Sequence, residues 1–468
     1  MTRANARVAM ISTCLAVLLA ASGVSAEVTC ITSAADAYWK TATTADSKAE
    51  TIDVTVSEDK VAQTWEGFGG SFNEMGWNYL TTKALQDEAI ALCFGPEGCR
   101  FSWGRIPIGA SDYAIDRYTL NETAGDFEMK NFSIERDKKQ LIPYIKAAQA
   151  VKGDIKFWAS PWTPPTWMKQ APFQPRATSN FDGGKMKSDE QTFKAYALYL
   201  VKFVQEYEKL GIKVEVVSPQ NEPNYEQNYP SCRWNAQQFT SFLPVLNTAI
   251  KDAGLKTKIM LGTMSNPSGD PQIINAVMAN AETSKMVSMI GVQWGVADQM
   301  AQYKKFDLPI WLTEHRCGNY PNTQRTNWNL APNGIAYAKD SWGYIRAAIK
   351  GGVTSYSAWN LVMDKVGWGI DTDRKWAQNA LLVADEGKLI KTPCYYLFRH
   401  MGQFVDPGAK VLETSTRDSL AFKNPDGSEV VVVYAAANAG KTEYTVSVAG
   451  KKIAFAMPSD GWATVKVK

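Results

Sequence analysis

The sequence predicts an α/β protein, a (β/α)₈ TIM barrel with an appended antiparallel β-sandwich domain formed from both chain ends. Between residues 60 and 360, eight short strand-like runs alternate with amphipathic helical stretches, which is typical of a parallel sheet. The chain has 468 residues, more than the roughly 250 that a barrel alone requires. After Gly408, short alternating runs separated by turns indicate a smaller antiparallel unit.

The eight predicted barrel strands are short and rich in β-branched or aromatic residues. They are Thr64–Phe68, Arg100–Arg105, Ile155–Ser160, Val214–Ser218, Lys258–Gly262, Met289–Gln293, Pro309–Thr313 and Val353–Trp359. The clearest helix covers residues 190–210, where Ser188 followed by Gln191 predicts a capping box and Gly211 ends the helix. Its predicted core face comprises Phe193, Tyr196, Ala197, Leu200, Val204 and Tyr207.

Alternating runs at the chain ends predict the second domain. Thr51–Val56 is a possible N-terminal strand, and the C-terminal runs are Ser419–Lys423, Glu429–Tyr434, Thr442–Val448, Lys452–Ala456 and Ala463–Val467. We therefore expect a signal peptide over 1–26, a sandwich segment over 27–64, the catalytic barrel over 65–400 and the C-terminal sandwich over 401–468.

The first 26 residues have the pattern of a secretory signal. Arg3 and Arg7 precede a mostly apolar run, Val8 to Ala21, and Val24-Ser25-Ala26 is a small-residue cleavage pattern. A membrane anchor is the alternative, but the run is too short for a stable span, and no other apolar stretch approaches 18 residues. We expect a mature protein that is secreted, periplasmic or at the cell surface.

Charge and histidine content exclude several classes of function. The net charge of +3 gives no reason to expect nucleic acid or an acidic membrane as partner. Only His315 and His400 are present, so a Ser-His-Asp or Cys-His hydrolase, or a His-rich metalloenzyme, lacks its components. Acid-base chemistry must fall mainly to carboxylates.

Two glutamates follow predicted barrel strands. The fourth strand runs into Gln220-Asn221-Glu222-Pro223 and the seventh into Thr313-Glu314-His315. Because the carboxyl ends of barrel strands open on one face, Glu222 and Glu314 should meet in one cleft. Two facing carboxylates are what glycoside hydrolysis needs, with a separation of about 5–5.5 Å expected for retention. The alternative is a pair of ordinary surface-loop glutamates.

The predicted cleft also has aromatic and polar candidates. Sugar rings stack on aromatic faces, and tryptophans crowd the strand ends, although any one of them could be core instead. The aromatic candidates are Trp158, Trp162, Trp167, Trp294 and Trp359, whereas Trp103 and Trp311 lie within strands and are expected in the barrel core.

Three polar residues complete this set. Arg105 ends the second strand and would help to keep Glu314 ionised, and Asp112 in the following loop could accept hydrogen bonds from two sugar hydroxyls. Either could instead form a structural ion pair. Asn221 is placed to donate to the sugar 2-hydroxyl.

Removal of the predicted signal peptide takes Cys14 with it and leaves six cysteines, and an even number in an exported chain predicts disulfides. Cys93 and Cys99 flank a short Gly/Pro loop that they could close, and Cys232 and Cys317 could be bridged across the cleft. Cys30 and Cys394 are the remaining candidates, and the overall pairing is open.

At these residues the chain resembles glycoside hydrolase family 30, which contains glucosylceramidases, β-1,6-glucanases and some xylanases. The matching stretches are Gly67–Gly70, Arg105–Tyr113, Phe127–Ile134, Ala159–Lys169, Ser218–Pro223, Trp311–Glu314 and Ala358–Leu361. The resemblance implies a barrel fused to a sandwich made from both chain ends, hydrolysis with retention, Glu222 as acid/base and Glu314 as nucleophile. It also implies that Asp112, Trp162, Asn221 and Trp359 bind the sugar in subsite −1, and that no metal or cofactor is needed.

Two departures from the family pattern bear on substrate. Related enzymes often place a histidine and a tyrosine after the sixth strand, where this chain has Gln293 and Trp294, so we expect an altered contact there. The loops Tyr225–Trp234 and Cys317–Asn329 look longer and more polar than a lipid-glucoside pocket would want, and could form plus-subsites for a polymer.

We therefore expect a monomeric, secreted endo-β-1,6-glucanase acting on a β-linked glucan. The alternatives are an exo-acting β-glucosidase or glucosylceramidase, which acts on another glucoside, and a carbohydrate-binding protein without catalytic activity.

Overall fold

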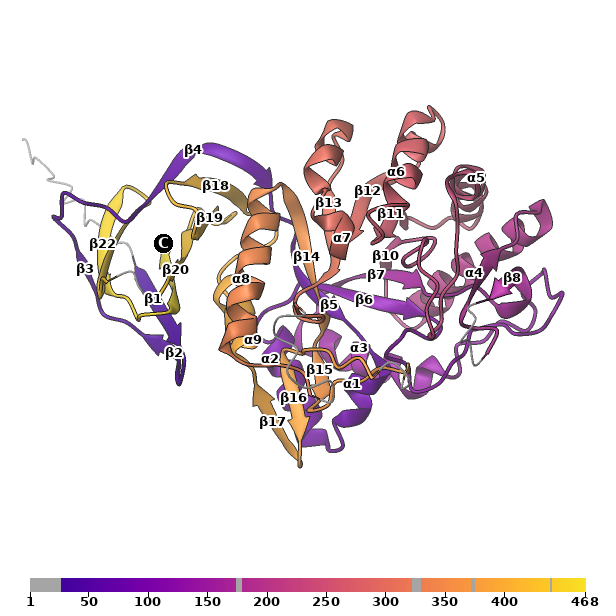
Figure 1. Cartoon of the computed structure of the whole chain (residues 1–468), viewed down its shortest axis with the longest axis horizontal. Coiled ribbons are helices and arrows are strands. Elements are labelled where there is room, and N and C mark those ends of the chain that lie inside the picture. The colour runs from indigo at the N-terminus through magenta and orange to yellow at the C-terminus, as the bar shows by residue number, and fades with distance from the viewer. Residues whose placement is uncertain (1–26, 174–178, 322–329, 372–374, 438–439) are drawn as a thin grey trace, which may run out of the picture.

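The computed structural model describes residues 27–173, 179–321, 330–371, 375–437 and 440–468. The predicted signal peptide therefore lies outside the described residues. Within the described ranges, no helix has the length and apolar character needed to cross a membrane. Figure 1 shows the barrel beside a smaller β domain that contains both the earliest and the latest strands of the chain.

All eight predicted barrel strands are confirmed, and they close into one parallel barrel. In chain order the barrel strands are β5 (Gly67–Ser71), β6 (Trp103–Ile108), β7 (Lys156–Pro161), β10 (Val214–Val217), β11 (Lys258–Met264), β12 (Val287–Gln293), β13 (Ile310–His315) and β14 (Val353–Asn360). The carboxyl ends of these strands therefore share one face of the molecule, as a site at the strand ends requires.

Helices follow each strand and pack around the barrel. They are α1 (Glu74–Tyr79), α2 (Lys83–Phe94), α3 (Leu141–Val151), α4 (Glu190–Lys209), α5 (Ala236–Asp252), α6 (Asp270–Ala279), α7 (Trp294–Ala297), α8 (Ile335–Lys350) and α9 (Pro393–Gly402). Short 3₁₀ turns lie at Asp137–Lys139, Thr166–Met168, Thr283–Lys285 and Met300–Phe306.

Helix α4 confirms the predicted apolar face, since all six residues named for it are buried. The predicted cap is wrong by one residue: Asp189 is the N-cap and its side chain accepts from the amide of Thr192. Ser188 instead accepts a hydrogen bond from the side chain of Gln238. A true capping box stands at the start of α5, between Asn235 and Gln238.

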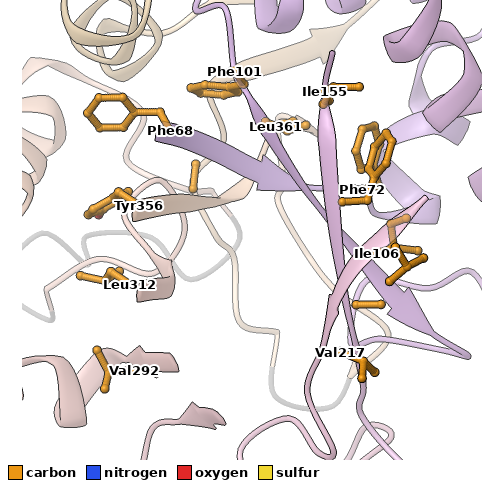
Figure 2. Close-up of a cluster of buried hydrophobic side chains, with 14 of the residues drawn as sticks. Phe68, Phe72, Phe101, Ile106, Ile155, Val217, Val292, Leu312, Tyr356 and Leu361 are labelled. Carbon is orange, nitrogen blue, oxygen red and sulfur yellow. The ribbon is translucent and has the colours of Figure 1, made fainter. Parts of the chain in front are cut away.

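Two apolar layers form on opposite sides of the barrel wall. The interior holds Trp103, Trp158, Val216, Met260, Met289 and Trp311. Neighbours in sequence such as Val217 and Leu312 face outward into the larger core under the helices (Figure 2). This alternation follows from the two-residue period of a strand, and it confirms Trp103 and Trp311 as core.

Three of the five residues of strand β5 are glycines, and neighbouring atoms fill the space that their side chains would take. A Cβ on Gly69 would collide with the backbone carbonyl of Trp103 on β6. The wide Trp103 side chain can therefore pack edge-to-face with Trp311, with 4.6 Å between ring centroids.

The second domain is made from both chain ends, as predicted. Its sheet order is β2-β1-β23-β20-β19-β18-β4-β21-β22-β3. The strands are β1 (Val28–Ala34), β2 (Ala37–Thr41), β3 (Thr44–Asp46), β4 (Val54–Thr64), β18 (Lys410–Thr414), β19 (Ser419–Lys423), β20 (Glu429–Ala435), β21 (Glu443–Val448), β22 (Lys451–Ala456) and β23 (Gly461–Val467). Strand β4 pairs with both β18 and β21 and so connects the two layers.

Strand β20 is buried on both faces, which explains its continuous valine run. Val431 and Val433 belong to the sandwich core. Val430 and Val432 belong instead to the large core that also contains the barrel's outward-facing residues. The two domains therefore share a continuous apolar core.

Two small sheets were not expected from the sequence. One joins β15 (Val362–Asp364), β16 (Leu382–Asp385) and β17 (Lys388–Lys391) after β14, and the other pairs β8 (Lys169–Phe173) with β9 (Gly183–Met186) after β7. Both lie in segments that follow barrel strands, so they shape the face on which the strands end.

The predicted disulfides are not present. All six cysteines from Cys30 onward are buried free thiols. The Cys317 thiol interacts with that of Cys394, on α9, whereas Cys232 lies beside Lys169, so a Cys232–Cys317 bridge has no support. Burial raises the pKa of the Cys93 and Cys232 thiols to about 12.

Candidate active site

Glu222 and Glu314 line the same pocket, a cavity of about 220 Å³. Glu314 lies in β13, and Glu222 lies five residues beyond the end of β10. The complete lining is Asp112, Glu222, Tyr225, Gln227, Tyr229, Ser265, Trp294, Glu314, Asn319, Trp376 and Gln378. The structure therefore has both carboxyl groups in one pocket at the strand ends, as the sequence predicts.

The segment that carries Glu222 is fixed by backbone hydrogen bonds to both neighbouring strands. The amide of Asn221 donates to the carbonyl of Pro161 at the end of β7, over 2.8 Å. The amide of Glu222 donates to the carbonyl of Thr263 on β11, over 3.0 Å, and the Thr263 amide donates back to Gln220. Glu222 has a φ of +47°, a left-handed conformation that costs a non-glycine residue energy and is found mostly at functional sites.

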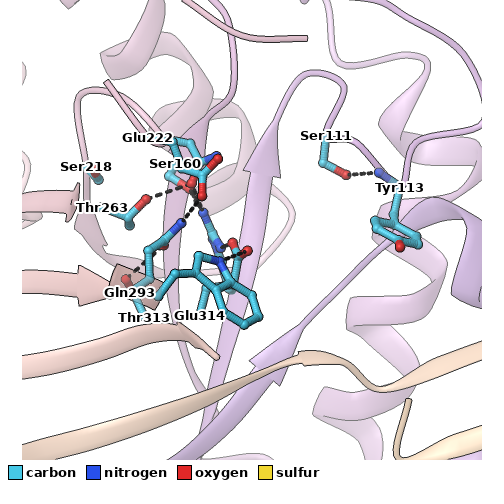
Figure 3. A network of polar contacts seen from close by, with 12 residues as sticks. Ser111, Tyr113, Ser160, Ser218, Glu222, Thr263, Gln293, Thr313 and Glu314 are labelled. Carbon is cyan, nitrogen blue, oxygen red and sulfur yellow. Dashed lines mark hydrogen bonds and ion pairs between the residues drawn. The ribbon is translucent and has the colours of Figure 1, made fainter. Parts of the chain in front are cut away.

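Neutral groups donate hydrogen bonds to the Glu222 carboxyl. Gln293 donates from Nε2 to Oε1 over 3.0 Å (Figure 3). The Tyr229 hydroxyl donates to Oε2 over 3.2 Å. A tyrosine hydroxyl can accept as well as donate. The contact between Tyr229 and Glu222 can therefore form with either side chain as the donor.

Glu314 is held by a cation and an indole. Arg105 donates from Nη1 to Oε2 over 2.5 Å, and Trp294 donates from Nε1 to Oε1 over 2.9 Å. Arg105 is fully buried and also donates to Ser160 and to the side-chain oxygen of Asn221. The predicted contact between Arg105 and Glu314 therefore exists, and it orients the carboxylate.

Three carboxyl groups share this one guanidinium. Burial raises the pKa of Glu314 to about 7, which Arg105 opposes and the negative charge of Glu222 reinforces. Burial, then the charges of Glu314 and Glu222, raise the pKa of Asp112 well above its ordinary value. Arg105 is therefore the charge that opposes protonation of both buried carboxyl groups.

The predicted aromatic residues separate into two groups. Trp294 lines the pocket. Trp162 and Trp359 are buried against each other behind it, with 5.6 Å between centroids. Trp158 is wholly buried in the barrel interior, so its assignment to the sugar-binding surface is not supported; it lies under Arg105, 4.9 Å from the guanidinium carbon.

Trp167 also points away from the pocket. Its indole donates to the carbonyl of Asn121 and its ring packs on Phe127. Gln293, where the sequence predicts an altered substrate contact, is fully buried and donates to Glu222. Asn221 lies beside the pocket with its oxygen held by Arg105 and Thr263.

Several lining residues were not singled out from the sequence: Tyr225, Gln227, Tyr229, Ser265, Asn319, Trp376 and Gln378. All follow barrel strands, and the first three lie in the loop suspected of forming plus-subsites, but such loops have no periodicity that identifies individual side chains. Trp376 donates from its indole to the side chain of Asn319, which joins two of the loops. Residues 322–329 of the second suspected loop lie outside the described residues.

The described parts of the chain contain no group of three His, Cys, Asp or Glu side chains arranged to hold a metal ion. The groups found at the pocket are carboxyl groups, one guanidinium and neutral hydrogen-bond donors.

Comparison with known proteins places this architecture in a family. The sequence model of the glycosyl hydrolase family 30 TIM-barrel domain matches residues 65–405, and that of the family's β-sandwich domain matches residues 408–465. The lysosomal acid glucosylceramidase of Mus musculus is 26% identical over 414 residues, 81% of this chain and 76% of the relative. The endo-1,6-beta-D-glucanase neg1 of Aspergillus fumigatus is 25% identical over 416 residues, 82% and 80% of the two chains.

Among solved structures, the endo-beta1,6-glucanase BT3312 aligns with a TM-score of 0.78 at 23% identity, covering 94% of this chain and 98% of its own. At that identity the likeness concerns the fold alone. Because the family's barrel and sandwich both match, in the order in which the chain presents them, the protein belongs to glycosyl hydrolase family 30.

Proposed function

We propose that the protein is an exported, retaining glycosidase that cleaves β-1,6-linked glucan internally, with Glu222 as acid/base and Glu314 as nucleophile. The observation that carries the proposal is the contrast between the two carboxyl groups in one pocket. Glu222 accepts hydrogen bonds from the neutral Gln293 amide and Tyr229 hydroxyl, whereas Glu314 is paired with the Arg105 cation, which favours its anion against the burial that raises its pKa.

In the first step Glu222 gives its proton to the glycosidic oxygen while the Glu314 carboxylate attacks the anomeric carbon. The glycosidic bond breaks, the leaving sugar departs with the proton, and an ester to Glu314 forms. In the second step ionised Glu222 takes a proton from water, the water oxygen attacks the anomeric carbon, and the ester electrons return to Glu314. Arg105 is placed to stabilise that returning charge.

Two further residues fit the sugar between the glutamates. The oxygen of Asn221 accepts from Arg105 and Thr263, which orients the amide and leaves its N–H₂ group to donate to a hydroxyl. The Oδ1 atom of Asp112 is buried and has no hydrogen-bond partner within the described structure. A sugar hydroxyl would supply that partner.

The remaining lining residues of the pocket argue for a second sugar on the leaving-group side. Tyr225, Gln227, Tyr229, Asn319, Trp376 and Gln378 present aromatic faces together with amide and hydroxyl groups. That mixture matches the alternating C–H and hydroxyl surfaces of a sugar and suits a ceramide chain poorly. The similarity to the Aspergillus endo-1,6-glucanase also supports this choice.

An exo-acting β-glucosidase or glucosylceramidase is the second candidate. The cavity of about 220 Å³ lies below the roughly 300–1,000 Å³ of common ligand pockets, which favours a single enclosed sugar. The similarity to the mouse glucosylceramidase supports it as well.

A panel of β-1,3-, β-1,4- and β-1,6-glucans, xylan, galactan, an aryl β-glucoside and glucosylceramide separates these candidates. We expect a mixture of gluco-oligosaccharides from the β-1,6-glucan at early times, and NMR of the first product should show the β-anomer. Glucose as the sole early product, or turnover confined to the aryl glucoside and glucosylceramide, would replace the endo-glucanase with the exo-acting alternative. The Glu314→Ala variant is the control, because it should be inactive on every member of the panel.

A further inference from the structure

Two consecutive residues, Gln293 and Trp294, reach the two catalytic glutamates separately. Gln293 donates to Glu222 over 3.0 Å and Trp294 donates to Glu314 over 2.9 Å. Consecutive residues of a regular strand point to opposite faces. Here the alternation ends because Trp294, just after β12, has a φ of +42°, and this left-handed turn lets the two consecutive side chains reach two different carboxyl groups.

The indole contributes a different contact from the one that Arg105 makes. An indole N–H is a neutral donor that can neither accept a hydrogen bond nor titrate. It therefore fixes the Oε1 atom of Glu314 without adding a second positive charge, which would make the carboxylate a poorer nucleophile.

The indole is itself held by His315. The two rings stack with 4.8 Å between centroids and 29° between planes. His315 follows Glu314 directly in β13, so the indole contacts two successive residues of one strand end through its N–H edge and its face.

His315 also packs against Tyr344 of α8, with 4.7 Å between centroids and 37° between planes. The guanidinium of Arg316 lies 4.5 Å from the Tyr344 ring centroid and donates to Asp340 on the same helix. Trp294, His315, Tyr344 and Arg316 thus form a column, called here the stacking column, that runs from the nucleophile to α8.

A hydrogen bond at Nδ1 does not account for the burial of the His315 imidazole. Its Nδ1 atom is buried and makes no hydrogen bond within the described ranges. Burial, with a further contribution from Arg316, lowers the pKa of His315 well below its ordinary value, so the ring is neutral and acts through its faces.

We propose that Trp294 holds the nucleophile through its indole N–H and that His315 is the positioning residue that keeps the indole in place. This inference rests on the proposed role of Glu314 as nucleophile.

The test compares Trp294→Phe, His315→Ala and His315→Phe by kcat, KM and the pH profile of kcat/KM on an aryl β-glucoside. Trp294→Phe keeps a ring but loses the donor, so kcat should fall by about 10- to 100-fold, the usual effect of losing such a partner. Because a bond donated to the carboxylate favours its anion, the acid limb of the profile should move to higher pH. The other charged groups around Glu314, which are Arg105, Asp112, Glu222 and Arg316, are unchanged in all three variants.

His315→Ala should change kcat and the acid limb in the same direction as Trp294→Phe, and His315→Phe should restore most of both because it can still stack. The double variant Trp294→Phe/His315→Ala should be little worse than Trp294→Phe alone, since both remove one interaction. Should His315→Ala fail to fold, Tyr344→Leu loosens the same column from a residue that is 37% exposed.

A purely structural His315 would lower the unfolding temperature and leave kcat and the acid limb as in the wild type, and that result would overturn the inference. His400→Gln is the matched control, since it alters another buried histidine that is outside the pocket lining. Glu314→Ala separates the two proposals. If azide restores its turnover with a glycosyl azide product, the nucleophile assignment stands and a wild-type-like His315→Ala defeats only the stacking column.

Discussion

The guanidinium of Arg105 binds Glu314 directly and also binds the residue next to Glu222. Through Nη1 it binds Glu314, and through Nη2 it binds Ser160 and Asn221, the residue next to Glu222. Its flat face lies 4.3 Å from the ring centroid of Trp162. A planar fork with several fixed N–H groups can make these contacts at once, which a lysine ammonium could not.

At the same scale, replacing Glu222 by Gln tests its role through the leaving group. General acid assistance matters most for a poor leaving group. We expect kcat/KM on a β-1,6-glucan to fall by about 10³-fold or more and that for a dinitrophenyl β-glucoside to fall much less.

The first-step and second-step roles of Glu222 can be distinguished with azide. In Glu222→Gln, the dinitrophenyl substrate should form the ester and then stall, because the base that activates water is missing, and azide should accelerate turnover. Equal losses on both substrates, without an azide effect, would contradict the assignment.

A site residue could be predicted from the sequence only where the end of a barrel strand could be recognised beside it. Glu314 directly follows an apolar run and Glu222 comes a few residues after another, so their shared face could be predicted. Trp158 stands inside such a run, opposite Arg105 in the β6–β7 register, and points into the barrel. Trp376 lies in a long loop after β14, and its contact with Asn319 depends on a closure that no local pattern encodes.

Among the elements, α9 connects the barrel to strands from both chain ends. Its His400 contacts Ser33 of β1 through Nε2 and Thr464 of β23 through Nδ1, both over 2.8 Å. Because the Thr464 hydroxyl donates to the carbonyl of His400, Nδ1 must be the ring donor and Nε2 the acceptor. The neutral ring therefore satisfies both hydroxyls.

This arrangement predicts acid sensitivity. Burial, with a smaller contribution from Arg399, lowers the pKa of His400 from 6.5 to about 3. Between these values the unfolded chain binds the proton and the folded chain does not, so stability is full above the unfolded pKa and falls as the pH drops. Near pH 5 the contribution of His400 should fall by about 1.4 kcal/mol per pH unit.

Urea unfolding of the wild type and His400→Gln between pH 4 and 7 measures this dependence. The glutamine cannot titrate, so the difference in free energy of unfolding between the two proteins should shrink as the pH falls. Parallel pH dependences would show that His400 does not titrate on unfolding.

The positions of elements were predicted well where hydrophobic periodicity was strong. Features were predicted poorly where several side chains could make the same interaction. The core face of α4 followed from its 3.6-residue spacing. Its cap did not, because Ser188 and Asp189 both offer an oxygen and only the backbone decides between them. The cysteine pairing failed for a similar reason, since sequence spacing carries no information on which thiols meet across the fold.

At the scale of the whole molecule, the barrel and sandwich share one core. Phe422, Val430 and Trp462 of the sandwich belong to the same buried cluster as the outward-facing side chains of the barrel. Ion pairs across the boundary, such as Lys339 with Asp460, add to this contact. We therefore expect a single cooperative unfolding transition, with activity lost in the same step.

Two neighbouring positions in β23 test that coupling. Val465 is fully buried in the sandwich core, whereas the next residue, Lys466, is only partly buried. Val465→Asn should destabilise the whole protein by about 3 kcal/mol, because it removes buried apolar surface and buries an amide. Lys466→Asn should stay within about 0.5 kcal/mol.

Calorimetry and residual activity after heating provide the measurement. For Val465→Asn both the transition and the loss of activity should move to lower temperature together. A separate early transition that leaves activity intact would mean that the sandwich unfolds on its own.

The pairing of β1 with β23, from Val28 opposite Val467 onward, has a consequence for biogenesis. A chain leaves the ribosome from its N-terminal end, so β1 emerges first and gains this neighbour only when residues beyond 460 have followed. Until then β20 also lacks one of its two partners. A nascent chain thus carries unpaired strand edges for most of its synthesis. Such edges can pair with those of other copies, so we expect chaperones to keep the incomplete chains apart.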